Sequence, residues 1–174
     1  MKKIYLLTLG VLLASHLEAQ NSPCTTDLGG GSDPSFLKFE ITGTVLIHET
    51  LSPLTTYYHE YPQANNTTAT LVAGQEYSAF TFTSSEAVVG LWIDSNQNNQ
   101  FEEDEFKLLV SSMSSQNNST FTVSADALPG NTKVRLRTRA YGSTITGLNA
   151  CTFFGSGETR DYTVTTKCHK HKFV

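Results

Sequence analysis

The chain has 174 residues, and its 12 basic and 16 acidic side chains give a net charge of −4 at pH 7. This acidic balance leaves no basic patch that could follow a phosphate backbone, so the sequence predicts no nucleic-acid partner. The length suits one domain with a core of useful size once a leader is removed.

The first 19 residues have the pattern of a signal peptide. Lys2 and Lys3 precede an apolar run over residues 4–14, and small and polar residues lead to a cleavage site after Ala19. The run is too short to cross a bilayer and no second apolar segment follows, so we expect no membrane span after cleavage. The sequence therefore predicts a secreted protein, extracellular or at the cell surface, with the periplasm as an alternative.

Residues 20–35 are expected to form a flexible N-terminal lead-in, because residues 25–34 are rich in glycine and polar side chains. Cys24 lies in this segment, Cys151 late in the chain and Cys168 near its end. Disulfides persist in exported proteins, so three cysteines allow one bridge and leave one thiol over.

The chain from residue 36 to residue 166 predicts an all-β domain. Short alternating or β-branched segments are separated by turn residues, without a convincing amphipathic helix. We expect an antiparallel β-sandwich of about eight strands, jelly-roll or immunoglobulin-like, and a frayed tail over residues 167–174 that carries His169 and His171. The expected strands cover residues 39–47, 67–72, 76–83, 88–93, 106–110, 120–123, 133–140 and 160–165.

Three local features refine this prediction. Gly43 is expected to mark a β-bulge in the first strand, and residues 73–74 to join the next two strands as a pair. The segment 88–93 is apolar at nearly every position, so we expect a central strand that is buried on both faces.

The segment 94–105 has the ligand spacing of a calcium-binding loop, in which hard oxygen ligands wrap around the cation. Position six normally requires glycine and is Asn99 in this chain, the next residue most tolerant of positive φ. Calcium is therefore the expected cofactor; the alternative is a solvated turn whose Asx side chains cap their own backbone. Positions one, three, five, seven, nine and twelve are Asp94, Asn96, Asn98, Gln100, Glu102 and Glu105.

The sequence predicts no catalytic site. The acids at 102–105 alternate in direction on one loop, whereas glycosidase carboxylates face each other across a cleft. His59 and Glu60 begin like the HExxH motif of zinc proteases, but Gln63 stands where the second histidine belongs. Residues 154–158 lack the spacing of a nucleophile elbow. We therefore expect a protein that is not an enzyme.

Several motifs together resemble a known family. WIDSNQNNQF covers residues 92–101, a glycine-led arginine strand with KVRLRTR covers 130–139, and GETRDY covers 157–162. With the earlier segments FLKFEITGTV and LVAGQEYS, they resemble the GEVED domain of secreted bacterial proteins over roughly residues 24–166. The chain departs from the family pattern at residues 98–99, where the family has Asp-Gly, and at 159–160, where it has Val-Glu.

The resemblance implies an extracellular β-sandwich module, usually found beside peptidases, adhesins or other surface domains, with no catalytic residues to carry over. It also implies a disulfide between Cys24 and Cys151, because family members often have cysteines near the start and just before the GEVED motif. Cys168 would then be free, or available for an intermolecular bond that makes an oligomer.

Arginines alternate along the predicted strand at 133–140. Arg135, Arg137 and Arg139 share one face, where three like charges repel unless they are offset. Glu158 and Asp161 open or belong to the neighbouring terminal strand, so we expect structural ion pairs between these acids and the arginines. Two alternatives stay open: a solvated arginine face, and a metal site that one of these acids completes with the acidic loop.

The leading hypothesis is a non-catalytic secreted module that binds an extracellular protein or glycan, with calcium stiffening one loop. Tyr57, Tyr58 and Tyr61 form an aromatic-rich segment that can offer a stacking platform for sugars, although strand packing explains them equally well. A structural surface-layer or matrix component is the second hypothesis, and a glycoside- or peptide-hydrolysing enzyme is the third.

Overall fold

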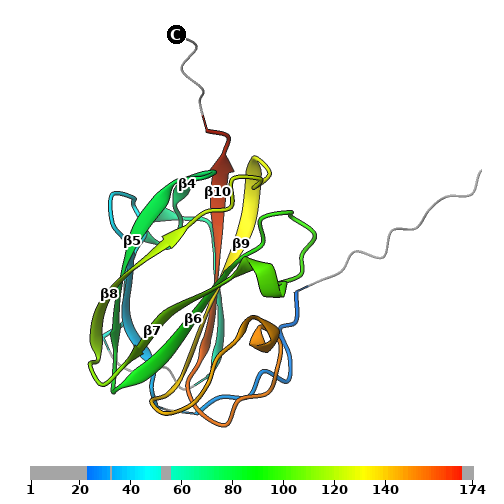
Figure 1. Cartoon of the computed structure of the whole chain (residues 1–174). Coiled ribbons are helices and arrows are strands. Elements are labelled where there is room, and N and C mark those ends of the chain that lie inside the picture. Colours follow the sequence, from blue (N-terminus) through cyan, green and yellow to red (C-terminus); the bar gives the residue numbers. More distant parts are fainter. Residues whose placement is uncertain (1–22, 32, 52–55, 170–174) are drawn as a thin grey trace, which may run out of the picture.

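The computed structural model describes residues 23–31, 33–51 and 56–169. In these ranges the chain forms ten β-strands in two packed sheets, without an α-helix, so the expected all-β sandwich is confirmed (Figure 1). No helix in the same ranges is long and apolar enough to cross a membrane. The expected signal peptide and His171 lie outside the described residues.

The smaller sheet has four strands in the order β2-β1-β5-β8, and its pairs are antiparallel. Buried and more exposed positions alternate along β5 and β8, as expected for a sheet with one face on the core and the other toward solvent. The strands are β1 (Phe36–Ile41), β2 (Ile47–Glu49), β5 (Glu76–Thr83) and β8 (Gln116–Thr122).

The larger sheet has the order β3-β10-β9-β6-β7, and β4 also pairs with β10. β3 and β4 pair in parallel with successive parts of β10, so this sheet is mixed rather than antiparallel throughout. The strands are β3 (Tyr58–Tyr61), β4 (Thr70–Val72), β6 (Ala87–Ile93), β7 (Phe106–Ser112), β9 (Gly130–Ala140) and β10 (Thr159–Lys167). Three 3₁₀ turns lie in the connections: η1 (Asn65–Thr67), η2 (Glu103–Glu105) and η3 (Gly147–Asn149).

The main core lies between the two sheets. Phe39, Leu91, Leu136 and Val164 face it from four different strands, and each is at most 1% exposed. Burial of one such side chain contributes about 1.5–3 kcal/mol. Each sheet therefore presents an apolar face, and the two apolar faces pack against each other.

Two of the observed strands, β2 and β3, were not predicted as separate strands. Residues 39–47 are not one strand with a bulge at Gly43: they contain the end of β1 and the start of β2, joined by a turn in which Gly43 has a φ of +82°. β3 was not predicted at all. Residues 73–74 do not join a hairpin, because β4 pairs with β10 while β5 pairs with β1 and β8. The chain crosses there from one sheet to the other.

The outer face of the larger sheet is covered as well. Two segments, residues 24–31 and 141–157, run together over it and are called the cover (Figure 1). Ile145 and Phe154 of the cover pack on Trp92 of β6, which explains why β6 is buried on both faces, as predicted. The expected flexible lead-in is thus wrong for residues 24–31, because Leu28 is buried and the segment is part of the domain.

Candidate calcium loop and the covered arginine face

The acidic loop connects β6 to β7 and is organised around Asp94. The Asp94 side chain is 2% exposed, and its two carboxylate oxygens accept the backbone N–H groups of Asn98 and Asn99, each at 3.1 Å. Asn99 has a φ of +62°, the left-handed conformation expected at position six, and Gln97 has a φ of +57°. The loop therefore closes tightly around one carboxylate.

Two further predicted ligands converge on Glu102. The Nδ2 groups of Asn96 and Asn98 donate hydrogen bonds of 2.8 and 2.7 Å to the two carboxylate oxygens of Glu102. A half-turn of each amide group about its terminal bond exchanges nitrogen for oxygen. These amides can therefore present oxygen to a cation that lies among them. The side chain of Gln100 is exposed.

Glu105 closes the loop from its far end. Its carboxylate oxygens accept the N–H of Ser95 at 2.6 Å and the N–H of Glu102 at 3.2 Å. Burial raises the pKa of Glu105 to about 7, and burial also raises the pKa of Asp94, although backbone N–H groups partly offset both shifts. Among the described residues, no Lys or Arg forms an ion pair with these two acids.

The acids of the loop do not suffice as a cation site. No group of three or more His, Cys, Asp or Glu side chains in the described ranges is placed to hold a metal ion. The amide oxygens of Asn96 and Asn98 would have to complete the ligand set with Asp94. The residues present fit calcium, which takes carboxylate and amide oxygens in flexible geometry.

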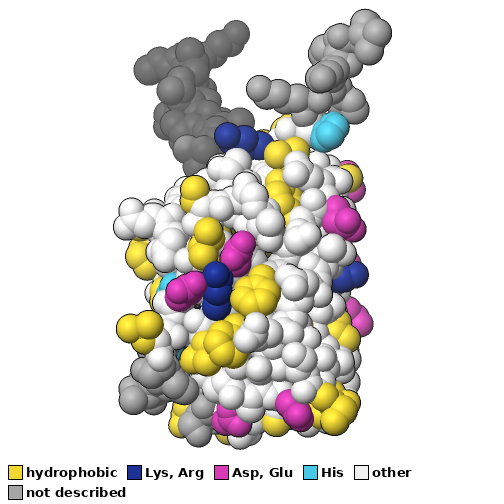
Figure 2. Space-filling model, turned by 90° about the vertical axis from the view of Figure 1, so that its left-hand side faces the viewer, with side chains coloured by type: hydrophobic (Ala, Val, Ile, Leu, Met, Phe, Trp, Pro, Cys, Tyr) yellow, Lys and Arg dark blue, Asp and Glu magenta, His cyan; other side chains and the backbone are white. Residues whose placement is uncertain are grey.

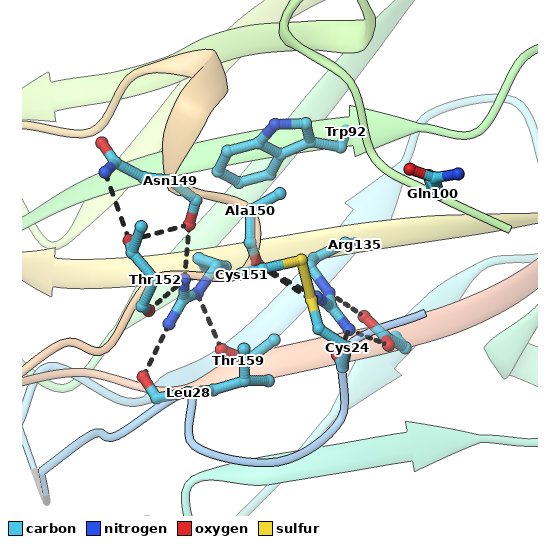
Figure 3. Close-up of a disulfide and its surroundings, with 12 residues drawn as sticks. Cys24, Leu28, Trp92, Gln100, Arg135, Asn149, Ala150, Cys151, Thr152 and Thr159 are labelled. Carbon is cyan, nitrogen blue, oxygen red and sulfur yellow. Dashed lines mark hydrogen bonds and ion pairs between the residues drawn. A yellow bond between two sulfur atoms is a disulfide. The ribbon is translucent and has the colours of Figure 1, made fainter. Parts of the chain in front are cut away.

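Arg135 is the centre of the arginine face and forms the predicted pair with Asp161. Its Nε and Nη2 donate to the two Asp161 oxygens at 2.8 and 2.7 Å, and both side chains are almost fully buried. The same guanidinium donates to the carbonyls of Cys24 and Ala150, so it also fixes both segments of the cover (Figure 3). The solvated arginine face is thereby excluded for this residue.

Arg137 is buried, and no carboxylate of the described residues pairs with it. Its guanidinium donates to the carbonyls of Leu28, Asn149 and Thr152 and to the hydroxyl of Thr159 (Figure 3). It also lies 3.9 Å from the ring centroid of Phe154, a cation–π contact. Burial, followed by the charges of the two neighbouring arginines, lowers the pKa of Arg137 to about 9, so it remains protonated at pH 7.

Glu158 forms a structural ion pair, as predicted, but with a different arginine from the three expected. Its carboxylate does not face the three arginines but pairs with Arg160 at 2.8 Å and accepts the N–H of Phe36 at 2.6 Å. Arg160 shares its face of β10 with Tyr162 and Val164, which point into the main core. This shared parity could have identified Arg160 as a buried residue. Arg139, the last of the three, donates to the carbonyl of Thr144 instead.

Both acids are buried in these ion pairs, so neither Glu158 nor Asp161 completes the acidic loop at 94–105.

Cys24 and Cys151 form the disulfide that the resemblance implied, across a sequence separation of 127 residues. It joins the two segments of the cover next to Arg135 and below the ring of Trp92 (Figure 3). Cys168 is an exposed free thiol. A disulfide of this kind indicates an oxidising, extracytoplasmic compartment.

The three tyrosines do not form one platform. Tyr58 faces the arginine side and donates to Asp161 at 3.0 Å, whereas Tyr61 lies on the other face of β3 and stacks on Tyr162 with ring centroids 5.1 Å apart. Tyr57 precedes the strand and is exposed. Strand packing therefore accounts for two of these rings. His59 and Glu60 lie in β3, not on the helix that a HExxH motif needs.

His48 is a buried titratable residue that the sequence did not single out. Its ring packs edge-on against Tyr61, and its Nδ1 is 2.9 Å from the Tyr162 hydroxyl. Burial, followed by the charge of Arg160, lowers the pKa of His48 to about 4. A histidine followed by a glutamate in a short strand carries no pattern that would reveal this.

The lowered pKa predicts a dependence of stability on pH. The unfolded chain takes up the His48 proton near pH 6.5, but the folded chain takes it up only near pH 4. Above about pH 6.5 both states hold His48 neutral, and the free energy of unfolding has its full value. We expect this free energy to decrease as pH falls toward 4, by up to about 3 kcal/mol. Urea unfolding of the wild type and of His48→Gln at pH 4, 5, 6 and 7.5 measures it. A stability difference between the two proteins that does not change with pH would contradict the prediction.

No curated protein matched. The model of the GEVED domain matches residues 88–165, a range that runs from β6 through the acidic loop at 94–105 and the arginines of β9 into β10. Residues 88–165 of the chain are therefore a GEVED domain, within the β-sandwich described above.

Proposed function

We propose that this GEVED β-sandwich is a non-catalytic module that binds an extracellular protein or glycan after secretion, in the medium or at the cell surface. The proposal is supported by the difference in solvent exposure between the outer faces of the two sheets. The middle of the larger sheet, at β6, is enclosed on both faces by the core and the cover, and the charged motif residues of β9 and β10 are fixed by internal hydrogen bonds. The smaller sheet leaves its outer face to the solvent.

The proposal is tested with residues 20–174, expressed for export and labelled with a fluorophore. We expect saturable binding to intact bacterial cells or to isolated envelope material, and no turnover of glycoside or peptide substrates. Hydrolysis that is lost in Asp94→Asn or Glu158→Gln, in proteins that still fold, would instead establish an enzyme. Absence of binding to every surface tested would overturn the proposal.

A second candidate is a structural component of a surface layer or matrix. The exposed thiol of Cys168 favours this candidate. Cys168 directly follows β10, and its thiol is available for a bond to another chain. A reducible oligomer on a non-reducing gel, absent in Cys168→Ser, would support this candidate.

We also propose that calcium stabilises the loop at 94–105. A cation that binds only the folded state at 100 times its Kd stabilises by about 2.7 kcal/mol. We therefore expect saturating calcium to raise the Tm of the wild type by roughly 5–10 °C relative to a chelator. Differential scanning calorimetry measures the shift.

The matched control is Asp104→Asn, an exposed acid of the same loop outside the expected ligand set. Its calcium-dependent shift should equal that of the wild type, whereas Asp94→Asn should have none. Equal shifts in all three proteins would show that calcium acts elsewhere, and no shift in the wild type would make the loop a solvated turn.

A further inference from the structure

The outer face of the smaller sheet exposes two aromatic rings in its middle. Phe80 and Phe82 lie two residues apart on β5, so they share a face, and both are only partly buried. Their neighbours on the same strand, Ala79 and Thr81, are fully buried on the core side. With a rise of about 3.3 Å per residue, the two rings occupy adjacent places roughly 7 Å apart along the strand.

A charged group borders the rings on one side. Lys38 lies opposite Phe82 on β1, and its Nζ is 3.2 Å from Glu40, 3.0 Å from Glu49 and 5.7 Å from the ring centroid of Phe80. Figure 2 shows this side of the molecule, with one basic side chain between two acidic ones beside hydrophobic side chains. The two carboxylates outnumber the one cation, so the group has no free positive charge to bind an anionic polymer.

Uncharged hydrogen-bonding groups border the rings on the other side. Gln116 lies opposite Phe82 and Asn118 opposite Phe80 on β8, and Thr120 lies opposite Ser78. The three β8 side chains are exposed. They provide both donors and acceptors along the rings. β8 is also the last strand of its sheet, so a long ligand can continue past this edge.

This combination matches the chemistry of a sugar ring. A pyranose presents an apolar C–H face, which packs on an aromatic ring, and a rim of hydroxyls, which pair with amides and other hydroxyls. An acidic polysaccharide or a nucleic acid would meet two carboxylates and one cation that they already neutralise.

We propose, resting on the proposed binding function, that Phe80 and Phe82 stack on an uncharged polysaccharide chain that lies along β5, with Asn118 and Gln116 bonding to its hydroxyls. This site replaces the tyrosine platform expected from the sequence. It lies on the opposite sheet from the covered arginines and is built by residues outside the matched GEVED range, apart from those of β8.

The experiment is affinity electrophoresis of residues 20–174 in native gels that contain a neutral β-glucan, a xylan, a mannan or an acidic pectin. We expect retardation by at least one neutral polymer. Phe80→Ala combined with Phe82→Ala should weaken that binding at least tenfold, and Asn118→Ala several-fold. The matched control is Phe153→Ala, an exposed phenylalanine of the cover, which should bind like the wild type.

Folding of each variant is verified by its thermal unfolding, and Asn118→Ala provides the test should the double variant not fold, because Asn118 is exposed. Neutral-polymer binding that survives both changes would overturn the site while leaving the binding function intact. Retardation by pectin alone, or labelling of cells with no retardation by any polymer, would overturn the ligand class. A dimer in sedimentation that Phe80→Ala abolishes would also overturn it, since the face would then bind a second copy.

Discussion

Replacement of Asp161 by asparagine is expected to lower the free energy of unfolding by about 3–5 kcal/mol, because it leaves the buried charge of Arg135 without its partner. Both side chains are at most 3% exposed, and their two hydrogen bonds are 2.8 and 2.7 Å long. Asparagine also offers one acceptor oxygen in place of two, so Arg135 and the Tyr58 hydroxyl, whose pKa is raised by burial, would compete for it. Urea unfolding at pH 7 measures the loss.

The neighbouring strand provides the matched control. Glu60 of β3 lies opposite Asp161 in the register and pairs with Lys133, but its side chain is 52% exposed. Glu60→Gln should cost less than about 1 kcal/mol, as exposed ion pairs do. Equal losses in the two variants would mean that burial of the Arg135 pair has no energetic consequence, and the cover would then not depend on a charged network beneath it.

Removal of the disulfide is the second large effect. In the chain-entropy model, a bridge across 127 residues stabilises the fold by about 5 kcal/mol, and its removal from small secreted domains typically costs about 2–5 kcal/mol. We expect a loss in this range for the double variant Cys24→Ser with Cys151→Ser, measured by urea unfolding. Cys168→Ser should leave the stability unchanged, because Cys168 is exposed and unbridged.

The same variant tests whether the cover is a local unit. Without the disulfide, the cover is still held by arginine–carbonyl hydrogen bonds and a small apolar cluster. We expect faster amide hydrogen exchange in residues 141–157 than in β9 of the same protein. Uniformly faster exchange throughout the domain would show instead that the bridge acts only on global unfolding.

The sequence was most informative where the residues of a single strand show a clear apolar run or a clear alternation. The apolar run of β6, the alternation in β9 and the acid at Asp161 were sufficient to predict a doubly buried strand and the Arg135 pair, because side-chain direction has a period of two. Asn99 at position six correctly predicted a left-handed turn residue.

Predictions failed where the partners of a side chain come from segments that are distant in the sequence. The buried guanidinium of Arg137 is hydrogen-bonded to backbone carbonyls of the cover, and nothing in a strand sequence indicates which loop will cover it. Tyr58 and Tyr61 belong to opposite faces of a four-residue strand, too short to give a clear period. The partners of Phe80 and Phe82 come from strands on both sides of β5, and only the sheet register brings them together.

The parallel pairing of β3 and β4 with β10 also sets the order in which the chain can assemble. β10 follows every one of its partners in the sequence. Until residue 167 has emerged from the ribosome or a translocation channel, β3 has no neighbour in the larger sheet and Arg135 has no carboxylate. Contacts between such distant segments form slowly. The larger sheet can therefore be completed only after β10, its last strand in the sequence, is available to pair with β3, β4 and β9.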